Sequence, residues 1–383
     1  MNFDFTDEQN MLRDSVAKLV AAKYDFDTRR KALAAAPGWR PDLWAEMGEL
    51  GLFMAPLPED MGGLGGTAVD AMVVMEEFGR GLVVEPYVAS VVHAGAAIRM
   101  GGSAAQREEH GARIASGEGI YAVAALEPKS RYDLADVATT ARKDGAGYVL
   151  SGHKAVVVGA PQADTLLVSA RTAGGARDRA GITLFAVPKS AAGLSTKDYP
   201  TVDGFRAADV FLENVSVGAD AVIGDVDGAL PVLEGAQDEA IAAICAEAVG
   251  AMRVAHAQTV EYARTRKQFG VTIGSFQVLQ HRMVDMFMAV EQSVSMACLA
   301  AIRCAEGDAL ERAKACSAAK TQIGRAGRFV GQNAIQIHGG MGMTEELAVG
   351  HYFKRLTIID SQYGSADWHV KRYAGLGTDR AAA

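Results

Sequence analysis

Clustered positive charge is missing from this chain of 383 residues. It has 38 lysine and arginine residues against 46 aspartate and glutamate residues, a net charge of −8, and no stretch dense in Lys or Arg. Proteins that bind nucleic-acid phosphates regardless of sequence depend on such clusters. The composition therefore argues against that class of protein, and we expect no nucleic acid as a partner.

Cysteine and histidine are scarce, and neither is spaced like a set of metal ligands. The eight histidines show no ligand spacing, and no pair of cysteines forms a CxxC motif. We expect no metal site, and we expect buried, reduced thiols in segments that are predicted to be helical. These thiols are Cys245, Cys298, Cys304 and Cys316.

Targeting and membrane-spanning signals are also lacking. The first residues, MNFDFTDEQNMLRDSV, are acidic from the fourth position and contain no apolar h-region of a secretory signal. We see no apolar run that approaches the roughly 20 residues of a membrane span. The sequence predicts a soluble, cytoplasmic protein without a membrane partner.

Apolar residues, at 49%, are plentiful enough for sizeable cores, and this length predicts two or three domains.

Thr6 begins a Thr-Asp-Glu-Gln capping box, after which apolar residues recur at three- and four-residue intervals, as in a helix. Residues 56–66 (PLPEDMGGLGG) must form a loop, because two prolines and four glycines interrupt any helix there. We predict an N-terminal helical domain at residues 1–118.

The pattern changes near Tyr121. Short β-branched runs at residues 148–150, 155–158, 165–168 and 182–187 are separated by turn residues, which predicts an antiparallel β-domain at residues 119–226. Helical periodicity returns after Gly228 and predicts a C-terminal four-helix bundle at residues 227–383. The predicted fold class is α+β, in the order helical, β, helical.

Several segments, taken in order, resemble the acyl-CoA dehydrogenase family over the whole chain. In the N-terminal half these are residues 5–9 (FTDEQ), 44–52 (WAEMGELGL), 58–66 (PEDMGGLGG) and 76–80 (EEFGR). In the C-terminal half they are residues 262–270 (YARTRKQFG), 275–277 (SFQ) and 336–344 (QIHGGMGMT). Several independent matches at family spacing are far more specific than a single motif.

The resemblance implies this family's fold and an FAD enzyme that removes two hydrogens from an acyl-CoA thioester. A base takes the α-proton, and the β-hydrogen leaves as hydride to the flavin. It also implies an electron-transfer flavoprotein or similar acceptor, and an oligomer: a homodimer, a homotetramer or a heterotetramer with a related chain. The implied FAD contacts across a subunit boundary are Arg266, Gln268, Phe269 and Gln277, and those facing the diphosphate are Gln336, Gly339 and Gly340.

The β-domain departs from the family pattern beside the flavin ring. Where many members have Thr-Glu-Pro-Gly-x-Gly-Ser-Asp, residues 126–133 read LEPKSRYD, which keeps Glu127 as an expected cofactor contact but loses the glycines. The Trp-Ile-Thr that usually covers the flavin is replaced by three valines at residues 156–158. This change removes an aromatic cover and a hydroxyl contact.

The catalytic base is the more serious departure. Its family position is occupied by Tyr363, followed by Gly364, and a phenol with a reference pKa of about 10 is a poor proton acceptor at neutral pH. A second family location for the base falls on Ala240, directly after Asp238 and Glu239. We take Glu239 as the candidate base, and we expect Asp238, Ala240 and Gly364 to contact substrate.

Other interpretations of these acidic residues remain open. Glu239 heads a stripe of small residues that leaves room for substrate or for close helix packing, whereas Asp238 and Glu239 could equally be first-turn acids at a helix dipole. Glu247 is expected to be an ion-pair partner, with Arg253 as its candidate cation. A helix surface is the expected place for His369.

Three functions follow from this reading. The first is an active acyl-CoA dehydrogenase in fatty acid and lipid degradation that uses Glu239 as a displaced base. The second is a catalytically incomplete subunit, close in style to the small subunit of pimeloyl-CoA dehydrogenases, whose base comes from a partner chain. The third is a member of the fold with other chemistry, such as a flavin monooxygenase, or with none.

Overall fold

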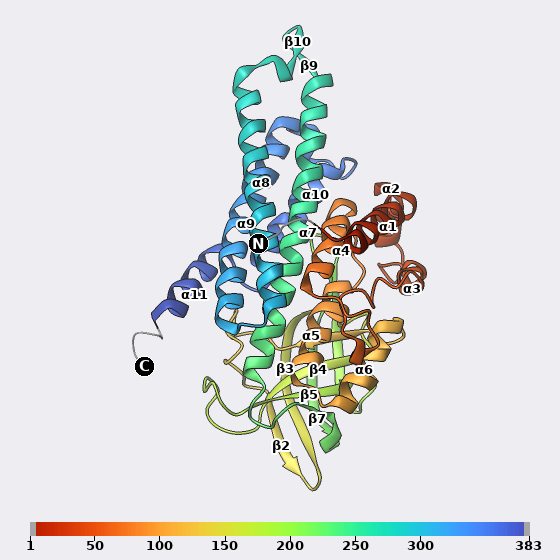
Figure 1. Ribbon diagram of the computed structural model, residues 1–383, viewed down its shortest axis with the longest axis vertical. Coiled ribbons are helices and arrows are strands. Elements are labelled where there is room, and N and C mark those ends of the chain that lie inside the picture. Colours follow the sequence, from red (N-terminus) through yellow and green to blue (C-terminus); the bar gives the residue numbers. More distant parts are fainter. Residues whose placement is uncertain (1–4, 379–383) are drawn as a thin grey trace. The chain divides into compact units, whose positions relative to one another are not determined.

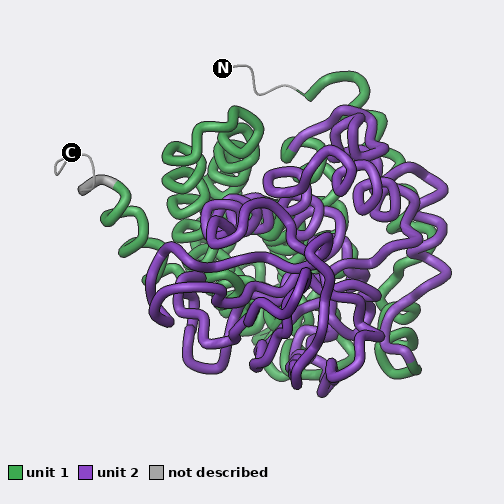
Figure 2. Tube along the Cα trace, turned by 90° about the horizontal axis from the view of Figure 1, so that it is seen from below, with its two compact units in different colours: residues 1–36, 68–83, 241–383 green, residues 37–67, 84–240 purple. Residues whose placement is uncertain are grey.

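The computed structural model describes residues 5–378, and the chain divides into two compact units (Figure 2). Unit 1 contains residues 1–36, 68–83 and 241–383, and unit 2 contains residues 37–67 and 84–240. Helix α7 (Leu230–Thr265) contributes its first part to unit 2 and the rest to unit 1. Each unit is described below by itself.

Unit 1 consists almost entirely of helices. Besides α7 its elements are α1 (Asp7–Lys23), α2 (Phe26–Ala34), α4 (Ala68–Gly81), α8 (Gln277–Glu306), α9 (Ala309–His338), α10 (Ala348–Ser361), α11 (Ala366–Thr378), the 3-10 helices η4 (Ile273–Ser275) and η5 (Gly339–Met343), and the strands β9 (Lys267–Gln268) and β10 (Val271–Thr272). Figure 1 shows α7, α8 and α9 running side by side, with the β9–β10 hairpin at one end. The C-terminal part of the chain is helical, as predicted, and unit 1 also includes α1, α2 and α4 from the N-terminal part.

Local sequence signals set the ends of several of these helices. Thr6 caps α1 in the predicted capping box: Gln9 N donates to Thr6 Oγ1 (3.2 Å), and Thr6 N donates to Gln9 Oε1 (3.1 Å). Gly307 ends α8 in the left-handed conformation, and the Asp308 carboxylate then accepts the first backbone N–H groups of α9. Such caps satisfy the orphan groups at helix termini, so the helices begin and end where the sequence provides partners.

Two glycines let α4 and α7 cross in backbone contact. A Cβ atom on Gly79 would lie 1.9 Å from the carbonyl oxygen of Glu247, and one on Gly250 would lie 1.9 Å from that of Glu76. No side chain fits at such distances. Gly250 belongs to the small-residue stripe of α7, so at this position the stripe serves close helix packing.

Unit 2 combines short helices with a β-sheet. Its helices are α3 (Pro41–Glu49), η1 (Glu59–Met61), the π-helix η2 (Val88–Ala94), α5 (Gly95–Gly101), α6 (Ala104–Ser116) and η3 (Ala219–Ala221). The predicted loop at residues 56–66 is present, with η1 inside it. A Cβ atom on Gly63 would lie 2.0 Å from the carbonyl oxygen of Leu57, so the loop folds back on itself at a glycine.

The strands of unit 2 are β1 (Tyr121–Ala124), β2 (Thr140–Asp144), β3 (Gly147–Val158), β4 (Thr165–Arg171), β5 (Ile182–Pro188), β6 (Leu194–Pro200), β7 (Arg206–Val217) and β8 (Val222–Ile223). They form one sheet in the order β6-β7-β3-β2-β4-β5-β8, with β1 paired to β4. All four predicted runs lie in strands. Most neighbouring strands pair antiparallel, as predicted, and the exceptions are β1 and β2, which both pair with β4 in parallel.

Helices α7 and α8 are long and apolar enough to cross a membrane, judged by length and composition alone. This corrects the reading that no apolar run approaches that length. The apolar window of α7 is 78% buried within the protein and that of α8 is 33% buried. Core helices of proteins outside membranes pass the same test, so the finding is weak evidence for a membrane span.

The four cysteines lie on helices α7, α8 and α9, as predicted, and all are free thiols. Cys245, Cys304 and Cys316 are buried, whereas Cys298 is partly exposed. The sulfur atoms of Cys304 and Cys316 lie 3.6 Å apart across the α8–α9 turn. Within residues 5–378, no group of three or more His, Cys, Asp or Glu side chains is arranged to hold a metal ion.

Candidate active site

Four of the eight predicted FAD contacts lie on or near the β9–β10 hairpin, at the outside of unit 1. Phe269 and Gly270 form its two-residue turn with φ values of 56° and 82°, and the Phe269 side chain is 92% exposed. Arg266 and Gln268 on the hairpin, and Gln277 at the start of α8, are exposed as well. An exposed aromatic on a defined turn is available for a contact outside its own chain.

The glycine segment predicted to face the diphosphate lies at the same end of the helices. The His338 ring at the end of α9 stacks on Tyr262 near the end of α7, with 4.4 Å between centroids, and Arg266 follows Tyr262 by one helical turn. Gly339 and Gly340 are exposed, and no protein atom lies within 4 Å of a Cβ built on either. The Gly339 N–H donates to the carbonyl oxygens of Ile335 and Gln336, but the space beside both glycines leaves room for the diphosphate of FAD to approach closely.

Tyr363 occupies a strained turn between α10 and α11. Its φ is 59° and that of Gly364 is 116°. A Cβ on Gly364 would lie 2.7 Å from the Trp368 ring, so only glycine fits there. Burial raises the pKa of the Tyr363 phenol to about 12, and the nearby Glu247 carboxylate also raises it. The phenol is therefore neutral at neutral pH and is no base.

Glu247 forms a buried bidentate ion pair with Arg355, at 2.5 Å and 2.6 Å. The expectation of an ion pair was correct, but the expected partner was not. Arg253 turns instead toward Glu76 (3.1 Å) and Glu291 (3.4 Å). Both carboxylate oxygens of Glu247 are thus engaged by Arg355.

The second candidate location lies in unit 2. Glu239 forms an ion pair with Arg99 of α5, and its neighbours Asp238 and Ala240 are both buried. Helix α7 begins at Leu230, so Asp238 and Glu239 lie in its third turn. The first-turn interpretation was therefore wrong, because the macrodipole acts mainly within the terminal turn.

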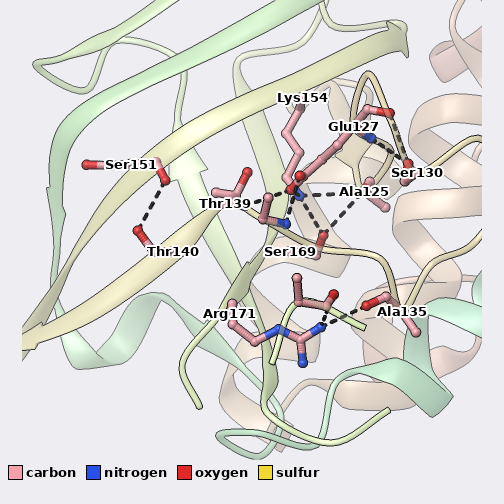
Figure 3. Close-up of polar contacts among 12 residues, drawn as sticks. Ala125, Glu127, Ser130, Ala135, Thr139, Thr140, Ser151, Lys154, Ser169 and Arg171 are labelled. Atoms are coloured by element: carbon pink, nitrogen blue, oxygen red, sulfur yellow. Dashed lines mark hydrogen bonds and ion pairs between the residues drawn. The ribbon is translucent and has the colours of Figure 1, made fainter. Parts of the chain in front are cut away.

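Glu127 is fully engaged inside the β-domain (Figure 3). Its Oε1 accepts hydrogen bonds from Lys154 Nζ (2.7 Å) and Thr139 N (2.9 Å), and its Oε2 accepts one from Ala138 N (2.8 Å). Burial acts to raise the pKa of Glu127, but the Lys154 ammonium and the hydrogen bonds outweigh it and lower that pKa. This geometry gives the carboxylate a structural role and no support for a cofactor contact through it.

The three valines at the family's flavin-cover position begin at a β-bulge. The register between β3 and β7 shifts between Lys154 and Val157. Val156, inside the bulge, has a φ of 53° and a side chain that is 56% exposed. A β-branched residue with positive φ is an outlier, and such strain is concentrated at functional sites.

Sequence reasoning missed two residues that contact the Tyr363 turn. His369 was expected on a helix surface, but it is fully buried, and its Nε2 lies 3.1 Å from the carbonyl oxygen of Tyr363. Lys320 of α9 is also fully buried and donates to the carbonyl oxygen of Gly364 (2.6 Å). The signal available for both was a polar residue among the small and apolar residues of a helix.

Comparison with known proteins agrees with this geometry. Residues 6–118 match the acyl-CoA dehydrogenase N-terminal domain, residues 122–215 the middle domain, and residues 232–373 the C-terminal domain. Acyl-CoA dehydrogenase FadE12 of Mycobacterium tuberculosis (strain ATCC 25618 / H37Rv) is 33% identical over 355 residues, which cover 91% of this chain and 90% of FadE12. The chain belongs to the acyl-CoA dehydrogenase family.

Solved structures support the same assignment. The ChsE4-ChsE5 complex from Mycobacterium tuberculosis has a chain that superposes with a TM-score of 0.89 at 26% identity, with full coverage of both chains. An FAD-dependent dehydrogenase superposes with a TM-score of 0.88 at 26% identity, covering 98% of this chain and 99% of the other. This acyl-CoA dehydrogenase is thus an oxidoreductase that acts on acyl-CoA, from a family of FAD-dependent enzymes.

Proposed function

We propose that this chain is a catalytically incomplete subunit of a heteromeric acyl-CoA dehydrogenase, close in style to the small subunit of pimeloyl-CoA dehydrogenases. The assembly carries out α,β-dehydrogenation of an acyl-CoA thioester, and a related partner chain supplies the base. One observation carries the proposal. The residue at the family's base position is Tyr363, and burial keeps its phenol protonated.

The state of the nearby carboxylates supports this proposal. Glu247, whose charge acts on Tyr363, is committed to Arg355. Glu239, at the second family location, is committed to Arg99. Each carboxylate would have to leave its arginine to reach a substrate, so the geometry favours neither as the general base.

The FAD-contacting residues of this chain support a role at a subunit boundary. When bound, FAD accepts the substrate's β-hydrogen as hydride. Gly339 and Gly340, where no protein atom occupies the space that a Cβ would take, would hold its diphosphate together with Gln336. Arg266, Gln268, Phe269 and Gln277 would contact the FAD of a neighbouring subunit, because they are exposed where α7 ends and α8 begins.

Further parts of the proposal rest on family resemblance. The partner is a related chain in a heterotetramer, and the ChsE4-ChsE5 complex is an example of two different chains in one assembly of this fold. We propose an electron-transfer flavoprotein or similar acceptor, a cytoplasmic location, and domains at residues 1–118, 119–226 and 227–383. Asp238, Ala240 and Gly364 remain proposed substrate contacts.

The test is flavin reduction under anaerobic conditions. The chain, purified alone with FAD, is mixed with a series of acyl-CoA esters, and the visible flavin absorbance is followed. We expect no bleaching by this chain alone, and bleaching after co-expression with a related chain that has a glutamate at the position of Tyr363. Bleaching by the chain alone would contradict the proposal.

The variant Glu239→Gln tests the alternative hypothesis that Glu239 is the base. We expect it to leave the rate of the co-expressed enzyme within about threefold of wild type, since the residue is an ion-pair partner. Glu234→Gln is a matched control, because Glu234 also lies on α7 and pairs with an arginine, Arg179, at 2.8 Å. A rate lost only in Glu239→Gln would assign the base to Glu239.

A further inference from the structure

Lys320 is a buried cation whose acceptors are both backbone carbonyls. Its side chain on α9 is fully buried, and Nζ donates to the carbonyl oxygens of Asp360 (2.9 Å) and Gly364 (2.6 Å). Within residues 5–378 no carboxylate forms an ion pair with it. Burying a charge without a counter-ion costs free energy, so a residue of this kind needs a reason to be there.

The segment that Lys320 holds contains a residue with a strained backbone. Tyr363, with a φ of 59°, is a bulky residue in the left-handed region, where non-glycine residues are uncommon. Such a conformation persists only where the surrounding contacts determine it. The two carbonyls held by Lys320 lie on either side of Tyr363 in the chain, so the lysine bridges the turn from one end to the other.

Two further hydrogen bonds fix the conformation of this turn. His369 Nε2 lies 3.1 Å from the carbonyl oxygen of Tyr363. Burial, with help from Lys320 and Arg372, lowers the pKa of His369 to about 3, so its ring is neutral and Nε2 carries the proton in this hydrogen bond. The Asp360 carboxylate accepts from Ala366 N (3.2 Å), which ties the end of the turn to its start.

We propose that Lys320 is a positioning residue that fixes the backbone of Tyr363 by bridging the carbonyls of Asp360 and Gly364. The inference takes from the proposed function only the assignment of position 363 as the family's base position. The anchoring itself holds whichever chain supplies the base. Lys320 acts through the turn, so its loss changes where the residue at position 363 is held.

The charged and titratable groups that face Lys320 come from three helices. They are Cys245 on α7, Arg355 and Asp360 on α10, and His369 on α11. Burial lowers the pKa of Lys320 to about 8, against the opposing effects of Cys245 and Asp360. Burial raises the pKa of the Cys245 thiol to about 12, so this thiol stays protonated while Lys320 titrates.

Trp368 is a natural reporter of the turn, because its ring packs against Gly364. The experiment uses the full chain and records tryptophan emission against pH for wild type, Lys320→Met and Trp368→Phe. The last variant isolates the signal of Trp368 from those of Trp39 and Trp44. We expect wild-type Trp368 emission to change with a midpoint near pH 8 and the change to be absent in Lys320→Met.

Amide hydrogen exchange of residues 361–369 gives an independent readout. We expect Lys320→Met to increase exchange there by about tenfold or more, because two charge-assisted hydrogen bonds are lost. Lys154→Met is the matched control: it removes another fully buried ammonium, in unit 2, and should leave these amides and Trp368 emission unchanged. Equal exchange in wild type and Lys320→Met would overturn the proposal.

The proposal stays testable if Lys320→Met does not fold. In that case amide hydrogen exchange of the wild-type chain decides, and exchange of residues 361–369 as fast as in an exposed loop contradicts the anchoring role. Neither readout uses acyl-CoA turnover. Failure of this inference is therefore distinct from failure of the proposed function, which flavin bleaching by the chain alone would reveal.

Discussion

At the scale of single residues, the ion pairs of this chain differ sharply in burial. The Glu247 and Arg355 side chains are 1% and 3% exposed, whereas Arg253 is 33% exposed and shares its charge between Glu76 and Glu291. Removing one partner of a buried pair leaves an uncompensated charge, whereas an exposed pair is screened by water. Loss of Arg355 should therefore lower the free energy of unfolding more than loss of Arg253.

We predict that Arg355→Met lowers the free energy of unfolding by about 3–5 kcal/mol, since Glu247 stays buried without its cation. The matched control Arg253→Met should cost less than about 1 kcal/mol. Urea denaturation of both variants measures this difference. Equal losses of unfolding free energy would show that the buried Glu247–Arg355 pair stabilises the fold no more than the exposed pairs of Arg253.

Tyr363 gives a second prediction at this scale. Burial raises its pKa to about 12, above the value near 10 of the unfolded chain, so the neutral phenol stabilises the fold below pH 10 and that contribution is lost as pH rises toward 12. Tyr121, Tyr199 and Tyr352 shift in the same direction.

Spectrophotometric titration of tyrosinate isolates this residue when wild type is compared with Tyr363→Phe. The difference between the two curves should be a phenol that ionises near pH 12 in the folded protein. A difference centred near pH 10 would mean that position 363 is open to water, and the argument against a phenolate there would fail.

At the scale of elements, the crossing of α4 and α7 depends on two glycines. We predict that Gly250→Ala destabilises the protein by about 1–3 kcal/mol or more, because the new Cβ meets the carbonyl oxygen of Glu76 at 1.9 Å and forces the helices apart. The control is Gly375→Ala on α11, where a Cβ would meet no atom within 4 Å. Thermal unfolding should show the control unchanged or slightly more stable.

The sequence predicted elements well where the signals are local. The capping box at Thr6 and the four β-branched runs needed only neighbouring residues, and both are present. The parallel pairing of β1 and β2 with β4 could not be predicted, because strand order depends on contacts between distant segments. The Glu247–Arg355 pair is of the same kind, since its partners are separated by 108 positions in the chain.

The candidate site was predictable only in part for the same reason. Motif resemblance proposed Tyr363 and the hairpin residues as site residues without any structure, and their roles remain predictions. It could not find Lys320, whose role depends on a turn 40 to 44 residues further along the chain. It also assigned Glu127 to the cofactor, since nothing local indicates that Lys154 engages this carboxylate.

At the scale of the whole molecule, the proposed function assigns the exposed hairpin to a contact with the FAD of a neighbouring subunit. We predict that Phe269→Ala leaves the free energy of unfolding within about 0.5 kcal/mol of wild type, since the ring is 92% exposed, but lowers the FAD retained by the co-expressed enzyme after gel filtration. Val202→Ala, at a residue 62% exposed in unit 2, is the control and should retain FAD fully. Equal retention in both variants would remove Phe269 from the cofactor site.

The most direct test of the central claim is deuterium exchange at the α-carbon of an acyl-CoA, because it needs a base but no hydride transfer. The chain alone, carrying FAD, is incubated with acyl-CoA in D₂O, and deuterium incorporation into the ester is measured by mass spectrometry. We predict no deuterium above the buffer control for this chain, and incorporation after co-expression with a partner that has a glutamate at the position of Tyr363. Incorporation by the chain alone that disappears in Glu239→Gln would contradict the account and place the base in this subunit.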